Sequence, residues 1–408
     1  MRILLLTPAD SDFPYAGNAL LRKTVDKIGC EDLLWCGLSG CNKWKAPASY
    51  KRMSVPARSV HWRLRGTMAG YFHAREINAR LQARQIARSI SGFKPSLIWV
   101  LAEDEAVNVA YFLQRRLGIP LHLTFHDAPE VYFRFFSSYS PLAMSLYLGR
   151  LKCLFNAASS FDAVTKELCD HVEKTFSSVK HIPSVVFSPS VPREWLQPAP
   201  ADRDFTPDSV KRIGFCGSMR VSREQWAQFM GLLSRLNCKV ELLAYTDRDF
   251  FPEVTIPANV TLRVEKYVPS ERELINCLRS AGIHGFYLGV WKDKEKELFW
   301  RTSLSSKIST YAAAGAPLIV DAAADSLVWK LVSKYNAGIR VGTGNDDDDV
   351  RQLSSVCFDP YSWDSYAQGL SRLSVKELDL DNQLIKLLDC FKRTVDRAGE
   401  QHVCSRNI

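Results

Sequence analysis

Short apolar runs alternate with longer amphipathic stretches along most of this 408-residue chain. Short apolar runs are typical of buried strands, whereas the longer stretches repeat their apolar residues at helical spacing. When strands and helices alternate along a chain, the strands form a parallel sheet whose two faces are covered by helices. The alternation therefore predicts an α/β protein built on doubly wound parallel sheets.

The first half of the chain carries six predicted strands, and the first of them is a run near the N-terminus that Pro8 ends. Because this run is too short for the apolar core of a signal peptide, we interpret it as a buried strand. The predicted strands are Ile3–Leu6, Leu33–Cys36, Leu97–Leu101, Leu121–Phe125, Ala163–Val164 and His181–Ile182. Helical patterns between them cover Ala19–Ile28, Ala74–Ser91 and Asn108–Arg116.

Prolines interrupt the alternation between residues 183 and 208, where six of them occur. Since proline has no amide hydrogen and a fixed backbone angle, such a stretch continues neither a sheet nor a helix. We therefore expect an N-terminal domain over residues 1–190 and a linker over residues 191–208. A C-terminal domain is expected over residues 209–360, followed by C-terminal helices over residues 361–408.

The alternation restarts after the linker. The predicted strands there are Arg212–Cys216, Val240–Ala244, Val260–Val264, Ile283–Leu288, Pro317–Val320 and Ile339–Val341. The predicted helices are Arg223–Arg235, Ser270–Ala281, Ser305–Ala314, Leu327–Lys334, about Tyr361–Leu373 and Asn382–Ala398. Ligands of such sheets bind outside the carboxyl ends of the strands, so we expect the site in a cleft between two facing domains.

The composition narrows the class of partner only in part. The formal charge of +9 permits an anionic partner such as a nucleotide, an acidic lipid or a nucleic acid. The sequence shows no recognised nucleic-acid-binding module, so nucleic acid is not expected. Eleven scattered cysteines, an odd number, indicate reduced thiols and a cytoplasmic protein. No apolar run is long enough to span a membrane as a helix.

An arginine-rich segment runs from Arg58 to Arg88, with seven arginines and Glu76 as its only acid. Aromatic residues, among them Trp62 and Phe72, are interspersed with the arginines. The simpler interpretation is a solvated helix face. The alternative is peripheral contact with an anionic membrane, on its inner face, or with a lipid-diphosphate acceptor, because cations flanked by aromatics suit a lipid interface.

The acidic run Asp346–Asp349 has no partners elsewhere that would make it a metal site. We interpret it as a solvated loop that leads into a helix starting near Val350, since negative charge is favourable at a helix N-terminus. The sequence therefore predicts no metal ion at this position.

The strongest local signal is the segment Leu304–Val320. Ser305 or Ser306 can cap a helix, Gly315 can end it, and a buried strand follows. The free amides and the positive dipole end of such a helix favour a phosphate, and Lys307 adds a full positive charge in the same turn. An ordinary capped helix with a solvent-exposed lysine is the alternative.

A second candidate is the turn after the strand that ends near Gly217. Glycine allows the backbone to approach a diphosphate closely, and Arg220 or Arg223 could neutralise its charge. The chain contains neither a G-x-G-x-x-G nor a G-x4-G-K-[ST] pattern, which disfavours a dinucleotide-binding dehydrogenase and a P-loop ATPase.

The order of these segments resembles GT-B glycosyltransferases, in particular the family-4-like group of bacterial sugar transferases. The Ser-Ser-Lys…Tyr-x-x-x-Gly-x-Pro order of Ser305–Pro317 is the most specific part of the resemblance. The other segments that carry it are Pro14–Asn18, Leu123–Asp127, Phe161–Glu167, Ile213–Gly217 and Pro360–Trp363. The resemblance implies two Rossmann-like domains, with the C-terminal helices crossing back to the first.

The resemblance also implies roles for individual residues. The second domain would bind a sugar nucleotide, and the first would bind a glycan, lipid-linked or small-molecule acceptor. The catalytic residues would be His126, Arg223 and Lys307. The donor-binding residues would be Gly217, Arg220, Tyr267, Ser305, Ser306 and Thr310, and the loop facing the acceptor or phosphate would carry Gly17, Asn18 and Asp127.

One position departs from the pattern of the family. Many members carry a Glu-x7-Glu motif, and the matching positions here are Thr302 and Thr310. Neither threonine can supply a carboxylate. The identity of the donor, and catalysis itself, are the properties that this departure affects.

The implied reaction is glycosyl transfer from a nucleoside-diphosphate sugar, as in polysaccharide biosynthesis, with retention and with neither metal nor other cofactor. Fixed cations and a helix N-terminus would stabilise the charge that develops on the departing diphosphate. Two alternatives stay open, a sugar-nucleotide-binding protein without transferase activity and a GT-B sugar-nucleotide epimerase. The Asp-Arg-Asp triplets at Asp202–Asp204 and Asp247–Asp249 would suit a metal-dependent GT-A transferase, which we regard as less favoured.

Overall fold

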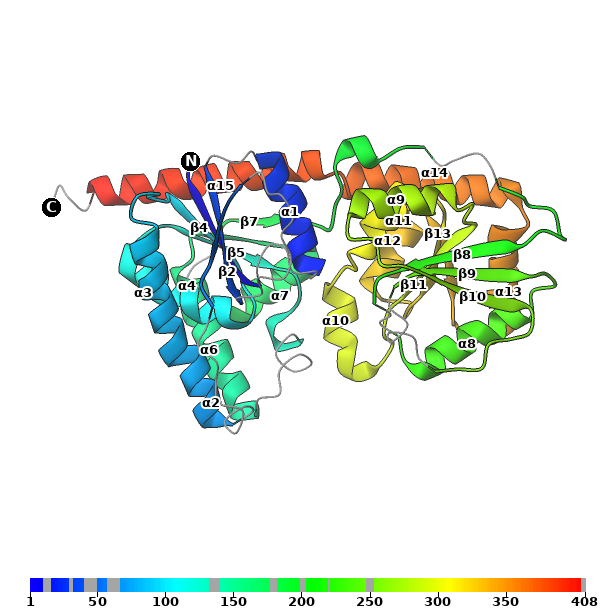
Figure 1. The fold of residues 1–408 in the computed structure, drawn as a ribbon, viewed down its shortest axis with the longest axis horizontal. Coiled ribbons are helices and arrows are strands. Elements are labelled where there is room, and N and C mark those ends of the chain that lie inside the picture. The colour runs from blue at the N-terminus through cyan, green and yellow to red at the C-terminus, as the bar shows by residue number, and fades with distance from the viewer. Residues whose placement is uncertain are drawn as a thin grey trace. The chain divides into compact units, whose positions relative to one another are not determined.

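The chain folds into two compact units, shown as a ribbon in Figure 1. Unit 1 comprises Met1–Ser188 and Asn382–Ile408, and unit 2 comprises Pro189–Asp381. Each unit contains one parallel sheet flanked by helices, which confirms the predicted α/β class. The computed structural model describes residues 1–9, 16–28, 32–39, 50–56, 67–131, 140–176, 182–198, 203–218, 221–246 and 253–404.

The sheet of unit 1 has seven strands in the order β3-β2-β1-β4-β5-β6-β7. Their bounds are β1 Ile3–Ala9, β2 Leu33–Ser39, β3 Lys51–Ser54, β4 Leu97–Leu101, β5 Leu121–Phe125, β6 Ser160–Ala163 and β7 Ser184–Val186. The edge strand β3 is short and mostly exposed, and it lacks the apolar run by which a buried strand is recognised. β7 begins after the predicted strand at residues 181–182, because the chain pairs with β6 only from Ser184 onward.

The helices of unit 1 include one that the sequence pattern missed, α6. Its bounds and those of the others are α1 Ala16–Ile28, α2 Met68–Phe72, the π-helix η2 His73–Asn78, α3 Ala79–Ser89, α4 Asp104–Leu117, α6 Pro141–Ala157, α7 Lys166–Phe176 and α15 Leu380–Cys404. Ser140 caps α6 by accepting a hydrogen bond from the amide of Ala143. α6 is apolar on most sides, so it shows little helical periodicity in the sequence.

The sheet of unit 2 has six strands in the order β10-β9-β8-β11-β12-β13. Their bounds are β8 Lys211–Cys216, β9 Val240–Tyr245, β10 Val260–Glu265, β11 Gly285–Gly289, β12 Leu318–Asp321 and β13 Gly338–Val341. The helices are η3 Arg193–Trp195, α8 Arg223–Ser234, α9 Glu271–Ser280, η5 Lys294–Lys296, α10 Glu297–Thr302, α11 Lys307–Ala314, α12 Leu327–Tyr335, α13 Asp346–Cys357 and α14 Pro360–Glu377. All six strands predicted for this half are present, with ends shifted by a few residues.

The limits of the two units differ from the expected domain limits in the proline-rich stretch and in the two last helices. Val191 forms an isolated bridge with Asp379, so the start of the expected linker belongs to unit 2. α14 packs against α11, α12 and α13 and also belongs to unit 2. The chain returns to unit 1 only from Asn382, within α15.

The interpretation of the acidic run as a solvated loop is wrong. Asp346–Asp349 form the first turn of α13, and Asn345 caps that helix. Asp349 is fully buried, where it accepts hydrogen bonds from the amide and the hydroxyl of Thr343 at 3.0 and 2.8 Å. The fourth acid of the run is therefore part of the fold and holds the loop after β13.

In the first Asp-Arg-Asp triplet, Arg203 has a packing role within unit 2. The Arg203 guanidinium lies 4.0 Å from the ring centroid of Trp363, and its Nε donates to the carbonyl of Ile283 at 2.7 Å. The second triplet, Asp247–Asp249, lies outside the described residues. Within the described part of the chain, no three histidine, cysteine or acidic side chains come together in a way that could hold a metal ion.

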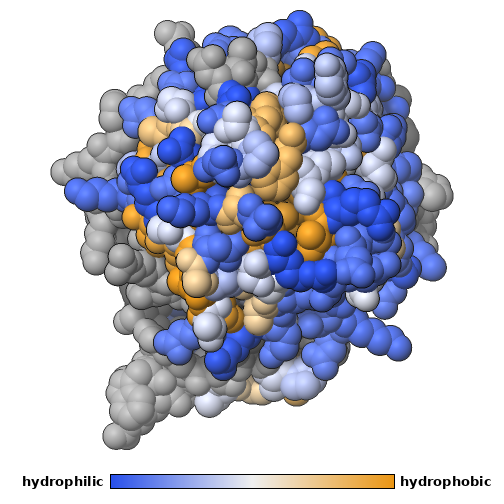
Figure 2. Space-filling model, turned by 90° about the vertical axis from the view of Figure 1, so that its right-hand side faces the viewer, coloured by the Kyte–Doolittle hydropathy of each residue, from blue (hydrophilic) through white to orange (hydrophobic). Residues whose placement is uncertain are grey.

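On the face shown in Figure 2, hydrophilic side chains surround smaller groups of hydrophobic ones near the middle. Isolated surface hydrophobics of this kind are normal. None of the helices in the described ranges combines the length and the apolar character needed to cross a membrane.

A buried polar network fastens α15 to the sheet of unit 1. His122 on β5 lies 2.7 Å from both Ser160 and Asp162 on β6, and all three are fully buried. From α15, Thr394 donates a hydrogen bond to Ser160 at 2.6 Å, and Phe391 packs edge-on against the His122 ring. Burial alone would lower the pKa of His122, but the hydrogen bond and the charge of Asp162 outweigh it and raise this pKa to about 9.

We predict that Asp162→Ala destabilises unit 1 by about 3–5 kcal/mol, because it leaves a buried imidazolium without its partner. A pKa raised in the folded state stabilises the protein fully below the unfolded value of 6.5, and this stabilisation is lost as the pH rises through about 9. Urea-induced unfolding over this pH range measures both effects, and the variant should lack the pH dependence that the pair contributes.

Asp170→Ala is the matched control, since Asp170 pairs with Lys166 on the exposed surface of α7. Its stability should stay close to that of the wild type. Equal destabilisation by the two substitutions would contradict the role given to the buried pair.

Candidate functional site

The carboxyl end of β8 and the start of α11 meet in unit 2. The amide of Cys216, the last residue of β8, donates a hydrogen bond to the Tyr311 hydroxyl at 3.0 Å. The Lys307 ammonium donates to the carbonyl of Ser218 and lies 4.5 Å from the centroid of the Phe215 ring. The structure thus brings two sequence candidates, the glycine turn and the lysine of the helix start, into one site, called the β8–α11 site below.

Gly217 directly follows β8 and begins the turn at its carboxyl end. Its backbone φ of +70° lies in the left-handed region, which favours glycine. A Cβ atom at this position would lie 3.5 Å from Cε of Lys307, so the glycine backbone approaches the lysine side chain directly. A ligand bound by the ammonium group would therefore also lie near the backbone of the turn.

The helix α11 starts two residues later than predicted, at Lys307. Ser306 occupies the cap position without a capping hydrogen bond from its side chain, and the Ser305 carbonyl accepts from the amide of Ile308 at 3.1 Å. The predicted cap by a serine hydroxyl is therefore wrong. The predicted end of the helix at Gly315 is confirmed by a φ of +85° there.

A carboxylate enters the same site from α9. The Thr310 hydroxyl donates a hydrogen bond of 2.8 Å to Oε1 of Glu271, the first residue of α9. Burial raises the pKa of the Cys216 thiol to about 11, and the charges of Lys307 and Glu271 act on this thiol with opposite signs. Because Lys307 and Thr310 lie three residues apart on α11, the helix holds the cation and the partner of the carboxylate on adjacent positions of one face.

Glu271 is the residue that sequence reasoning missed. Ser270 caps α9 by accepting a hydrogen bond from the amide of Glu273, and acids are common in the first turn of such a helix. Nothing in the local spacing separates Glu271 from an ordinary first-turn acid. Only the contact with Thr310, 39 positions away, identifies it.

The other position of the Glu-x7-Glu comparison has a local role. Thr302 is buried, and its hydroxyl donates to the carbonyl of Leu298 at 2.6 Å within α10.

Tyr267 follows β10 and lies close in the chain to the start of α9, and 49% of this residue is exposed. Its exposed ring is available for stacking against a flat ligand.

The arginines after β8 are less closely tied to this site. Arg220 lies outside the described residues. Arg223 is the exposed first residue of α8, where Ser222 and Gln225 form a capping box. Its side chain lines an open hollow of about 360 Å³ together with Val254 and Pro257.

Two of the candidates in unit 1, His126 and Asp127, directly follow β5. The side chain of His126 is 11% exposed, and its Nδ1 lies 3.9 Å from Oε1 of Glu103, which follows β4. Neither ring nitrogen of His126 has a hydrogen-bond partner among the described residues. Burial lowers the pKa of His126, so the ring is neutral near pH 7. Asp127 beside it is half-buried.

Two residues of the expected glycine turn near the N-terminus are helical. Gly17 and Asn18 lie in the first turn of α1, which begins at Ala16 rather than at Ala19. Residues 10–15, which include the start of the expected turn, lie outside the described residues.

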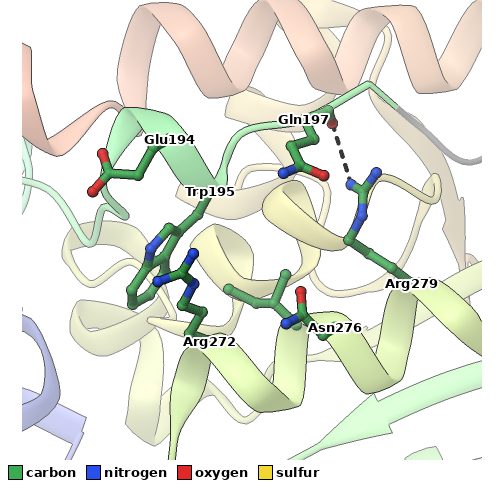
Figure 3. A pocket seen from close by; sticks show the side chains of 7 residues that line it. Glu194, Trp195, Gln197, Arg272, Asn276 and Arg279 are labelled. Carbon is green, nitrogen blue, oxygen red and sulfur yellow. Dashed lines mark hydrogen bonds between the residues drawn. The ribbon is translucent and has the colours of Figure 1, made fainter.

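A separate pocket of about 250 Å³ lies between η3 and α9, and Figure 3 shows its lining side chains. Arg279 on α9 donates to the carbonyls of Gln197 and Pro198 at 3.3 and 2.7 Å, and also to Ala313 at 3.0 Å. These bonds fasten the segment after η3 to α9 and α11. The Arg279 guanidinium therefore has a structural role in this pocket.

Comparison with solved structures identifies the fold. No family model matches the sequence, and no curated protein matches it. HepE of Anabaena, solved with UDP and glucose, aligns with a TM-score of 0.64 and 11% identity, covering 96% of this chain and 100% of that chain. A glycosyltransferase of Rickettsia africae aligns with a TM-score of 0.63 and 12% identity, covering 97% and 98%.

A third similar structure is the α,α-trehalose-phosphate synthase of Burkholderia xenovorans in complex with glucose-6-phosphate. It aligns with a TM-score of 0.59 and 12% identity over 97% of this chain and 100% of that chain. Together with the two parallel sheets, these alignments confirm the predicted GT-B fold.

We predict that Tyr311→Phe lowers the free energy of unfolding of unit 2 by about 1–3 kcal/mol, because the buried amide of Cys216 loses its acceptor. Thermal or urea unfolding measures the loss. Tyr361→Phe is the matched control, since 86% of Tyr361 is exposed. A Tyr311 variant as stable as this control would show that the bond does not hold β8 to α11.

Proposed function

We propose that this chain is a glycosyltransferase that takes a sugar from a nucleoside-diphosphate donor. The observation that carries the proposal is the β8–α11 site, where Lys307 lies against the backbone of Gly217 and Ser218, and Thr310, on the same helix, holds the carboxylate of Glu271. The GT-B fold supports it, and HepE of the same fold was solved with UDP and glucose. A UDP-sugar is therefore the first donor to test.

The diphosphate of the donor would bind at the turn. The ammonium of Lys307 offers charge-assisted hydrogen bonds, which are the strong ones for phosphate oxygens. Gly217 allows the backbone to come close, and the positive end of the α11 dipole points the same way. Arg223, exposed at the start of α8, would supply a second cation.

The ribose of the nucleotide would bind to Glu271. A carboxylate accepts several hydrogen bonds through its two oxygens, and Thr310 donates one of them to Oε1 of Glu271. Acidic residues beside a phosphate-binding turn commonly accept hydrogen bonds from ribose hydroxyls. α9 would thus supply the carboxylate that Thr310 itself lacks.

The chemical step would be driven by stabilisation of the leaving group. Negative charge grows on the nucleoside diphosphate as the sugar–phosphate bond breaks, and Lys307 with the start of α11 stabilises it. This mode of catalysis requires no metal ion, and we propose that the reaction retains configuration. In unit 1, the neutral ring of His126 would orient a substrate hydroxyl, next to a glycan, lipid-linked or small-molecule acceptor.

Two other activities fit the same site. A sugar-nucleotide-binding protein without transferase activity is favoured by Thr302, whose hydroxyl is bonded within α10 at a position where the family often has a carboxylate. A sugar-nucleotide epimerase would need no acceptor. Release of the nucleoside diphosphate separates enzyme from binder, and product analysis with and without acceptor separates transferase from epimerase.

We predict that Lys307→Ala lowers kcat by roughly 30- to 1,000-fold, because one charge-assisted contact to the leaving group contributes about 2–4 kcal/mol. Arg223→Ala should also lower kcat. The measurement is release of nucleoside diphosphate from UDP-glucose and other sugar nucleotides. Lys330→Ala, at an exposed position of α12, should leave kcat unchanged. Undiminished turnover in Lys307→Ala would remove this residue from the site.

We predict that the protein prefers ribonucleoside diphosphates over their 2′,3′-dideoxy forms, and that Glu271→Gln abolishes the preference. Hydrogen bonds to a charged group contribute about 1.5–3 kcal/mol, which corresponds to roughly 10- to 100-fold in Kd. Calorimetric titration with UDP and with 2′,3′-dideoxy-UDP measures the two Kd values, and their ratio gives the preference.

Glu273→Gln is the control for this experiment, because Glu273 lies in the same helical turn and is exposed. Thr310→Val should weaken the preference in part by releasing Glu271. If Glu271→Gln discriminates between the two nucleotides as well as the wild type, the ribose assignment is wrong.

A further inference from the structure

A single stripe of exposed side chains runs along α2, η2 and α3 in unit 1. Residues five apart align across a π-helix, which places Ile77 one turn after Phe72. On the α-helix that follows, residues three or four apart align, so that Leu81, Arg84 and Arg88 continue the same face. All five side chains are exposed.

The character of this stripe changes along its length. Phe72, Ile77 and Leu81 are 57%, 45% and 39% exposed, so its first part presents apolar surface to water. Arg84 and Arg88 form its second part. Arg80 lies beside it, with its guanidinium 4.7 Å from the centroid of the Phe112 ring. A water-exposed helix face would ordinarily carry polar residues throughout.

The outer face of α6 adds further apolar surface. Leu142 is 60% exposed and Leu146 is 48% exposed, whereas Tyr147 and Leu151 on the other face are fully buried. α6 contains no acidic residue, and its first charged residue is Arg150. The exposed side of its first two turns is therefore uncharged.

Two contacts bring α6 beside α2 and η2. The hydroxyl of Ser140, which caps α6, donates to Sδ of Met68 in α2 at 3.4 Å. Arg150 pairs with Glu76 of η2 at 2.5 Å. Figure 1 shows α2 and α6 at the same end of unit 1. The second contact also neutralises Glu76, the only acid between residues 67 and 90.

We propose that unit 1 docks onto an anionic lipid bilayer through this surface. Its residues, called the docking surface below, are Phe72, Ile77, Leu81, Arg84, Arg88, Leu142 and Leu146. Apolar side chains at one end of such a surface enter the boundary between headgroups and acyl chains, while arginines at the other end bind anionic headgroups. The inference is independent of the β8–α11 site, which lies in unit 2.

Charge decides between a bilayer and other occupants. The same surface of a second copy of this chain would offer these arginines no free acid, since Glu76 is paired with Arg150, and a purely apolar partner would leave them without counter-charges. A bilayer that contains phosphatidylglycerol or another acidic lipid offers an apolar interior and a negative surface together. This combination matches both parts of the docking surface.

Sedimentation of the full chain with vesicles tests the proposal. The wild type should bind vesicles made from equal parts of phosphatidylcholine and phosphatidylglycerol, bind pure phosphatidylcholine vesicles at least tenfold more weakly, and lose binding as salt rises. Arg84→Gln with Arg88→Gln should weaken binding to the anionic vesicles by roughly tenfold or more. Leu142→Glu with Leu146→Glu should weaken it at least as much.

Val375→Glu is the matched control, since Val375 is 52% exposed on α14 of unit 2. It should bind anionic vesicles like the wild type, and circular dichroism should show all variants folded. Three results would overturn the proposal: no binding to either vesicle, equal binding to both, or unchanged binding by the two double variants. Self-association that Leu142→Glu with Leu146→Glu abolishes, without vesicle binding, would assign the surface to a second copy instead.

Discussion

The candidate site depends on one junction, at which the end of β8 is hydrogen-bonded to α11. The Cys216 amide would otherwise be a buried donor without an acceptor, and the Tyr311 hydroxyl satisfies it from the second turn of the helix. This bond fixes the start of α11 against the glycine turn, so that Lys307 reaches the Ser218 carbonyl. The position of the cation is thus a consequence of packing and not of the flexible lysine chain alone.

The same junction explains how a threonine can stand where a carboxylate is expected. Thr310 lies one residue before Tyr311 and is held equally firmly, since both are buried in α11. Its hydroxyl donates a hydrogen bond to Glu271, so that α11 holds the carboxylate of Glu271 one helical turn from Lys307. At the position where the resemblance leads us to expect a carboxylate, the structure therefore places a threonine bonded to an acid from a different helix. The residue at position 310 does not by itself reveal that Glu271 supplies a carboxylate there.

The sequence predicted much of the fold because buried strands have a strong local signal. Leu97–Leu101 and Leu121–Phe125 were predicted with the observed limits, since each is a continuous buried run. The edge strand Lys51–Ser54 was missed because it is polar and exposed. For the site, the pattern indicated Gly217 and Lys307, but only the fold brings them together. Glu271 could not be predicted, since its role depends on a contact far along the chain.

The missed helix α6 links prediction to surface chemistry. A helix with one buried face normally shows a periodic alternation, and its absence ordinarily means burial on all sides. α6 is apolar around most of its circumference, yet Leu142 and Leu146 are exposed to solvent. The apolar composition that removes the periodic pattern from α6 therefore also leaves apolar side chains exposed at its start, beside α2. Both observations follow from one physical fact, that the outer face of the first two turns of α6 presents Leu142 and Leu146 and no charged side chain.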